Sequence, residues 1–104
     1  MYSRVTLLEI DTVRADVDEA LELYRREVLS DLRRQPGYEG VLVLVNPEGQ
    51  GLVMTLWSSE EAMAATMPIA AGAVERFMTV FRAPPGREGY EVRLAELPEL
   101  APEY

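Results

Sequence analysis

The chain has 104 residues, of which 48% are apolar, enough to bury the core of one domain. With 18 acidic and 10 basic residues the net charge is −8, which excludes nucleic acid and acidic membranes as natural partners because few cations are present to neutralise phosphates. All the basic residues are arginines, and the absence of Cys, His and Lys excludes disulfides and thiolate, imidazole or Schiff-base chemistry.

The first third of the chain predicts a strand followed by a long helix. Residues 2–10 are rich in Val, Leu and Ile and predict the strand. Asp16 is placed to cap a helix, with Glu19 at the position that completes a capping box. A helical stripe follows at spacings of three and four: Val17, Leu21, Tyr24, Val28 and Leu32. The helix is expected to run to about Arg34 and to end before the Pro-Gly pair at 36–37.

The rest of the chain predicts a hairpin, a second helical region and a last strand. Two β-rich runs, 41–45 and 52–57, surround an Asn-Pro-Glu-Gly turn. Ser58 and Glu61 predict a capping box for a helical region over 59–82, which Pro68 should divide. The Pro-Pro-Gly sequence at 84–86 is expected to end this region, before a strand over 90–94 and an extended tail over 97–104.

The order β-α-β-β-α-β predicts an α+β, ferredoxin-like fold with both helices on one face of an antiparallel sheet. Residues 41–45 are apolar on both strand faces, and 52–57 nearly so, which would leave apolar surface on the uncovered side of the sheet. In this topology the strand over 41–45 also lies at a sheet edge. We therefore predict a homodimer that packs sheet to sheet.

Two short motifs carry a resemblance to a known family. The sequence QPGYEG at 35–40 is followed by the hairpin and by TLWSSEEA at 55–62, with a late strand around 90–92. In this order and separation they resemble antibiotic biosynthesis monooxygenase domains. The resemblance covers nearly the whole chain and implies that residues 1–104 form a single domain, which assembles as a dimeric α/β barrel. The family includes enzymes for cofactor-independent oxidation of anthrone-like aromatics, quinol oxidation, haem degradation and sugar-phosphate isomerisation, and also many members with no assigned activity.

Haem degradation is the activity that the resemblance favours least. The haem-degrading members use a histidine roughly where Met67 falls and an asparagine roughly where Thr6 falls, and this chain has neither. We expect a cofactor-independent monooxygenase acting on a small electron-rich aromatic, an anthrone or hydroquinone. The alternative is a non-catalytic homodimer of the same fold that binds a small apolar molecule or serves as an interaction module. An isomerase or decarboxylase would need an acid–base pair that the sequence does not show.

Trp57 is the first candidate for substrate binding. In the family the tryptophan of this motif commonly lines a pocket between sheet and helices, so the resemblance implies that Trp57 forms a flat wall for an aromatic ligand. A core tryptophan whose indole N–H meets a backbone carbonyl is the alternative. Strand alternation predicts that Thr55 and Val53 share its face.

Tyr24, Thr55, Thr6 and Tyr38 are the other candidates for substrate binding. The Tyr24 hydroxyl is expected to point from the helix toward the sheet, where it either packs or donates to a developing oxyanion. Thr55 and Thr6 offer hydroxyls, although β-branched residues in strands need no further explanation, and Tyr38 either packs or binds. Glu9 is expected on the strand face opposite Thr6, either as a buried base or, as we favour, in an interface ion pair with an arginine, so no catalytic base is evident.

The sequence shows no motif for binding a metal or a cofactor and none for insertion into a membrane. Without His or Cys, and with no carboxylate spacing typical of a calcium loop, we expect no metal site. No glycine-rich phosphate loop follows a strand, so we expect no cofactor. The N-terminus lacks a basic segment followed by an apolar stretch, and the longest uncharged run, 62–74, is shorter than a bilayer span. A cytoplasmic protein is the expectation.

Overall fold

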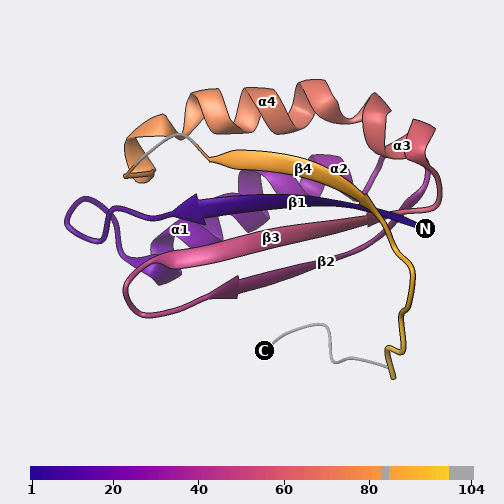
Figure 1. The fold of residues 1–104 in the computed structure, drawn as a ribbon. Helices are drawn as coiled ribbons and strands as arrows, with labels where there is room; N and C mark the ends of the chain where they lie inside the picture. The colour runs from indigo at the N-terminus through magenta and orange to yellow at the C-terminus, as the bar shows by residue number, and fades with distance from the viewer. Residues whose placement is uncertain (83–84, 99–104) are drawn as a thin grey trace.

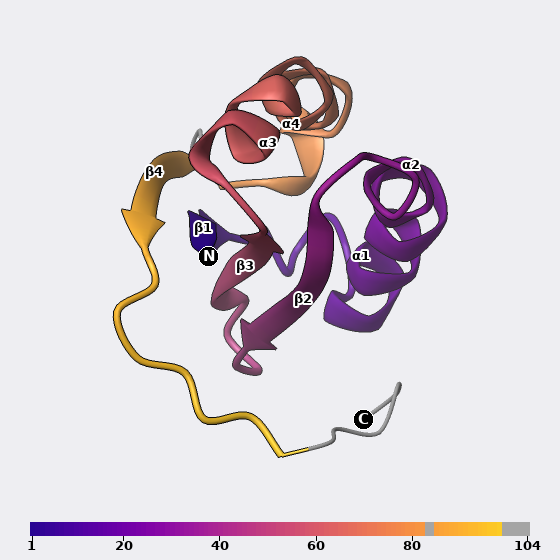
Figure 2. The same cartoon turned by 90° about the vertical axis from the view of Figure 1, so that its right-hand side faces the viewer.

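The computed structural model describes residues 1–82 and 85–98. One antiparallel sheet has the strand order β2-β3-β1-β4 (Figure 1). Its strands are β1 (Tyr2–Glu9), β2 (Tyr38–Val45), β3 (Gln50–Trp57) and β4 (Gly86–Glu91). The helices are α1 (Val17–Tyr24), α2 (Ser30–Leu32), α3 (Glu60–Ala65) and α4 (Met67–Arg76). All four cover the same face of the sheet, as Figure 2 shows, so the predicted ferredoxin-like fold is confirmed.

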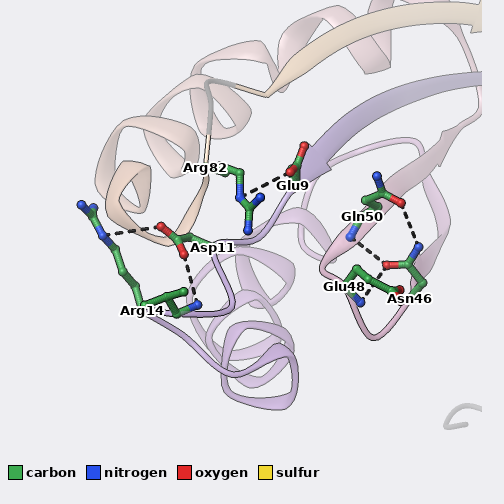
Figure 3. Close-up of polar contacts among 8 residues, drawn as sticks. Glu9, Asp11, Arg14, Asn46, Glu48, Gln50 and Arg82 are labelled. Atoms are coloured by element: carbon green, nitrogen blue, oxygen red, sulfur yellow. Dashed lines mark hydrogen bonds and ion pairs between the residues drawn. The ribbon is translucent and has the colours of Figure 1, made fainter.

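Asn46 shapes the hairpin between β2 and β3. Its Oδ1 accepts hydrogen bonds from the backbone N–H groups of Glu48 at 3.1 Å and Gln50 at 3.0 Å, as Figure 3 shows. Its Nδ2 donates to Gln50 Oε1 at 3.1 Å. Gly49 supplies the positive φ of +89° that the turn requires. The predicted hairpin is confirmed, and its strands are longer than expected because pairing extends to Tyr38, across a register shift between Tyr38 and Gly40.

The first helical region contains a π-helical segment that the periodicity does not predict. Asp16 caps α1 as expected, accepting from the Asp18 N–H at 2.9 Å. A π-helix then runs over Arg25–Leu29, and the region ends in α2 rather than at Arg34. The wider π turn brings Val28 and Leu29, adjacent in sequence, both into the core. A regular period of 3.6 predicts only Val28 on that face.

The second helical region is divided as predicted, but its cap lies one residue later. α3 ends before Thr66, and Pro68 stands in the first turn of α4, where proline is tolerated. The cap is Ser59, whose Oγ accepts from the Ala62 N–H at 3.1 Å. Ser58 instead donates its backbone N–H to the Gly37 carbonyl at 2.8 Å. The region ends in a 3₁₀ turn, Met78–Val80, short of the expected residue 82.

The last strand begins earlier than predicted. β4 pairs with β1 from Gly86 opposite Leu7 to Glu91 opposite Tyr2, so the prediction of a strand over 90–94 was wrong in its bounds. The sequence at 84–86 favours a turn, but Gly86 joins the strand because its backbone pairs with Leu7 of β1. Residue 84 lies outside the described residues. Of the tail predicted over 97–104, residues 97 and 98 have no regular structure, and 99–104 lie outside the described residues.

Gly37→Ala is expected to destabilise the protein by about 1–3 kcal/mol. Gly37 has a φ of +85°, and an added Cβ would lie 2.5 Å from the Ala62 Cβ. Gly72 in α4 gives a matched control, because nothing lies within 4 Å of an added Cβ there and Gly72→Ala should stabilise the helix. Urea unfolding of both variants measures the difference, and equal midpoints would contradict it.

The side of the sheet away from the helices carries an uncovered apolar surface in the described chain, here called the open face. It follows from strand alternation and register and comprises Val5, Leu7, Leu42, Leu44, Leu52, Met54, Leu56 and Tyr90. Leu7 and Leu44 are 60% and 53% exposed. In Figure 2 the segment after β4 curves past this side of the sheet.

Candidate functional site

A cavity of about 110 Å³ lies between the sheet and the helices that cover it. Apolar side chains from β1, β2, β3, α1 and α4 line most of its wall, among them Leu8, Val43, Val53, Leu21 and Val74. At one end, Ile10 forms an isolated β-bridge with Phe81, and both residues line the cavity. The cavity is therefore an apolar chamber built into the fold between its two layers.

The polar side chains gather at the other end, and the strand register explains why. Arg4 stands opposite Thr55 on β3, and Thr6 stands opposite Arg87 on β4. All four line the cavity, and Tyr24 joins them from the last turn of α1. Farther along β1, Leu8 and Ile10 continue the same face with apolar side chains. The cavity thus has a polar end and an apolar end.

Three of the five predicted binding residues, Tyr24, Thr55 and Thr6, line this cavity. Burial, and then the nearby Tyr38, raise the pKa of the Tyr24 phenol, while the Arg4 charge acts in the opposite direction. The phenol is therefore neutral at physiological pH. Within the described residues no group forms a hydrogen bond with its hydroxyl. Tyr24 is accordingly a free hydrogen-bond donor at the polar end.

Trp57 and Tyr38, the other two, lie behind the cavity wall in the described structure. Trp57 is completely buried and packs with Val28 and Leu32 in the core. The Tyr38 ring meets it edge to face, with centroids 5.7 Å apart. The indole N–H donates to Thr55 Oγ1 at 2.8 Å rather than to a backbone carbonyl. Because that bond uses Thr55 as an acceptor, the Thr55 hydroxyl proton stays available to the cavity.

Arg4 is the functional candidate that sequence reasoning missed. Its side chain is 4% exposed and donates to Thr66 Oγ1 at 3.1 Å and to the Met63 carbonyl. Burial lowers the pKa of the guanidinium, and Arg87 lowers it further, although an arginine remains charged at neutral pH. The signal was present in the sequence, since Arg4 shares the strand face of Thr6.

Glu9 lies outside the cavity wall and pairs with an arginine of its own chain. Glu9 Oε2 is 3.4 Å from Arg82 Nε, and the Arg82 N–H donates to the Glu9 carbonyl at 2.8 Å. Figure 3 shows this pair beside Asp11, which contacts Arg14 Nε at 3.6 Å. The Asp11 N–H donates to the Val80 carbonyl at 2.8 Å. The bonds of Glu9 and Asp11 to Arg82 and Val80 thus join residues 80–82 to the end of β1, beside the apolar end of the cavity.

Residues 1–82 and 85–98 contain no group of three or more Asp, Glu, His or Cys side chains arranged to hold a metal ion. No helix in this part of the chain has the length and apolar character needed to cross a bilayer.

Tyr24→Phe is expected to change how stability depends on alkaline pH. An exposed phenol in the unfolded chain titrates near pH 10, whereas burial raises the pKa of Tyr24 in the folded protein. The unfolded state therefore releases this proton first, and stability should fall as the pH rises above about 10. Tyr24→Phe should make that fall shallower, although Tyr2, whose pKa is raised chiefly by Glu91, keeps part of it. Urea unfolding between about pH 7 and 11 tests this, and parallel curves for the two proteins would contradict it.

The fold and the cavity define the class of protein: an α+β sandwich with a chamber between the sheet and the helices. Comparison with known proteins shows which solved structures share this fold. No protein-family model and no curated protein match the sequence. Solved structures do match. A monooxygenase from the gene ActVA-Orf6 of Streptomyces coelicolor, in complex with nanaomycin D, is 22% identical over 94% of this chain and 92% of its own, with a TM-score of 0.70.

Two further solved structures match this chain over almost the whole length of each protein. SnoaB, a cofactor-independent oxygenase from Streptomyces nogalater, is 14% identical over 94% of this chain and 97% of its own, with a TM-score of 0.71. The haem-degrader MhuD from Mycobacterium tuberculosis, with two haems in its active site, is 24% identical over 92% and 99%, with a TM-score of 0.68. The chain has the fold of the antibiotic biosynthesis monooxygenase domains, as its motifs predicted.

Proposed function

We propose that this protein is a cofactor-independent monooxygenase that oxidises a small electron-rich aromatic of the hydroquinone or anthrone type. The observation that carries the proposal is the cavity, an apolar chamber with the hydroxyls of Tyr24, Thr55 and Thr6 at one end. Monooxygenases and a cofactor-independent oxygenase among the similar structures support the same reading. The proposed site is the whole chamber, with the hydroxyls as donors to the substrate.

The chemistry resides largely in such a substrate. Loss of a proton to solvent, as the substrate enters the cavity, gives an enolate or phenolate. This anion passes one electron to O₂, and the resulting radical pair joins to form a C–O bond and a peroxide anion. The peroxide takes up a proton, and the hydroperoxide then loses water, so that substrate and O₂ become a quinone and one water molecule. The protein holds the ring, excludes bulk water and directs the three hydroxyls toward the developing oxyanion. Trp57 is a positioning residue in this scheme, because its N–H orients the Thr55 hydroxyl.

The size of the cavity favours a single ring. A designed apolar cavity of about 150 Å³ is known to bind benzene, and this one is about 110 Å³. A hydroquinone fits that scale better than a three-ring anthrone. With such a substrate, a ring C–H becomes the C–OH of a hydroxyquinone, and one atom of O₂ leaves as water.

A non-catalytic ligand-binding domain is the second candidate, and one observation favours it. No Asp or Glu side chain is among the described residues that line the cavity, and the chain has no histidine. An oxygenase of this design must release the substrate proton to solvent, whereas a binding protein needs no base. Oxygen uptake separates the two functions. If the protein only binds ligands, aromatic compounds should quench the fluorescence of Trp57 while no oxygen is consumed.

We also propose that two copies pack through the open face. Leu7, Leu44 and Tyr90 are each more than half exposed there, and monomers seldom leave such a surface uncovered. Light scattering at micromolar concentration should give twice the mass of one chain. A monomer under those conditions would contradict the proposal.

Oxygen consumption by EDTA-treated protein tests the proposed activity. A panel of hydroquinones and anthrones is supplied with ¹⁸O₂, and the quinone product is analysed by mass spectrometry beside a no-protein control. We expect uptake well above autoxidation and one labelled atom in each product molecule. Uptake equal to the control across the panel would overturn the proposal and leave the ligand-binding alternative.

A further inference from the structure

We infer that Arg4 and Arg87 bind a carboxylate group on the ligand, so that the cavity selects a small aromatic acid. This inference deepens the proposed function, on which it rests for the role of that acid as substrate. It comes from four features of the described structure: the burial of Arg4, the chemistry of its partners, the neighbouring charge of Arg87 and the apolar remainder of the cavity.

The guanidinium of Arg4 is buried without a counter-charge among the described residues. Its hydrogen bonds go to a hydroxyl, Thr66 Oγ1, and to a backbone carbonyl, that of Met63. No Asp or Glu in residues 1–82 or 85–98 forms an ion pair with it. Neutral acceptors satisfy some of its five N–H donors but do not neutralise its charge. A buried cation in this state is costly, and an anion beside it recovers that cost.

Arg87 adds a second positive charge at the same end of the cavity. It stands opposite Thr6 on β4 and lines the cavity. Both arginines line the cavity, and the charge of Arg87 lowers the pKa of Arg4, as expected for two like charges. No described acidic residue pairs with Arg87 either. An anion bound by both arginines removes the repulsion, and the forked donors of arginine match a carboxylate in geometry.

The remainder of the cavity specifies what the anion is attached to. Beyond the Arg4 and Thr6 positions, β1 presents Leu8 and Ile10, and Phe81 closes that end. A chamber of about 110 Å³ with this lining suits one aromatic ring. The net charge of −8 gives the chain as a whole no attraction for anions, so the affinity must come from these two arginines. Benzoate is the simplest molecule of this description.

Calorimetric titration with benzoate and with benzamide, its neutral analogue of similar shape, tests the inference. The wild-type protein is expected to bind benzoate about tenfold more tightly, which is the scale of hydrogen bonds to charged groups. Arg87→Gln should lower the affinity for benzoate by about threefold to tenfold and leave the affinity for benzamide unchanged. Arg87 is itself exposed, so Arg93→Gln is the matched control, because it makes the same charge change at an exposed residue outside the cavity lining.

Arg4→Met makes the same test at the buried arginine. It removes the cation and keeps much of the side-chain volume, and the Thr66 hydroxyl still donates to the Met63 carbonyl at 2.8 Å. We expect this variant to fold, to lose the preference for benzoate over benzamide, and to be at least as stable as the wild type to urea. A folded Arg4→Met variant that keeps the preference would overturn the inference.

Other outcomes are equally decisive. Equal binding of benzoate and benzamide by the wild type, or no saturable binding of benzoate, overturns the inference. In that event oxygen uptake with neutral hydroquinones would still support the proposed function. Benzoate binding that depends on Arg4 and Arg87, without oxygen uptake on any substrate, supports the inference and overturns the oxygenase instead.

Discussion

Trp57→Ala is expected to lower the free energy of unfolding by about 3–5 kcal/mol. Trp57 is completely buried, packs against Val28 and Leu32, and meets the Tyr38 ring edge to face. Removing the indole leaves a cavity in the core and deprives Thr55 Oγ1 of its donor. A loss of activity in this variant would therefore reflect unfolding as much as a changed site.

Trp57→Phe separates the packing of Trp57 from its hydrogen bond. The smaller ring keeps most of the apolar contact and should cost about 1–2 kcal/mol, while the N–H donor to Thr55 is lost. Urea unfolding of the wild type, Trp57→Phe and Trp57→Ala at one pH measures both effects. A Trp57→Ala variant within about 1 kcal/mol of the wild type would contradict the placement of Trp57 in the core.

Leu44→Glu is expected to weaken the proposed homodimer by more than about 100-fold. Leu44 is 53% exposed on the open face, at the sheet edge formed by β2. In a dimer packed through this face the new carboxylate would be buried without a partner in each copy, whereas in a monomer water would solvate it. The variant should thus remain folded while its dimer dissociates.

Val13→Glu provides the control for this change. Val13 is 90% exposed in the loop before α1, away from the open face, so the same substitution should leave the dimer intact. Sedimentation velocity over a range of concentrations gives the dissociation constant for each protein. Equal dissociation constants for Leu44→Glu and the wild type would place the interface elsewhere.

The fold was predictable because local signals and tertiary packing agree over most of the chain. The apolar stripe of the first helix, the Asn46 turn and the Pro68 division each have a local physical cause, and the structure contains all three. The predicted bounds of the last strand were wrong for a non-local reason, because pairing with β1 decides where β4 begins. The π-helix at Arg25–Leu29 likewise has a non-local cause, because it allows the adjacent residues Val28 and Leu29 both to be buried in the core.

The candidate site was predictable only in part. Strand alternation separated Thr6 from Glu9 and put Thr55 on the face of Trp57, and the stripe of the first helix pointed Tyr24 toward the sheet. That Thr6, Thr55 and Tyr24 line one cavity depends on the register between β1 and β3, which the sequence does not reveal.

Alternation also places Arg4 on the face of Thr6, but arginines are usually exposed, and the burial of Arg4 depends on its bonds to the distant Thr66 and Met63. That Trp57 packs behind Thr55 depends on how deeply the helices bury that end of β3, which no local pattern reveals.

Oxygen uptake by a variant with a filled cavity tests the central claim most directly. Ala70 in α4 lines the cavity, and Ala70→Phe should fill it and abolish uptake and aromatic binding together. Ala64→Phe makes the same change at an exposed residue of α3 and should keep the wild-type rate. Both variants are compared with the wild type after urea unfolding has shown that they are folded. Undiminished uptake by a folded Ala70→Phe protein would contradict the assignment of the reaction to this cavity.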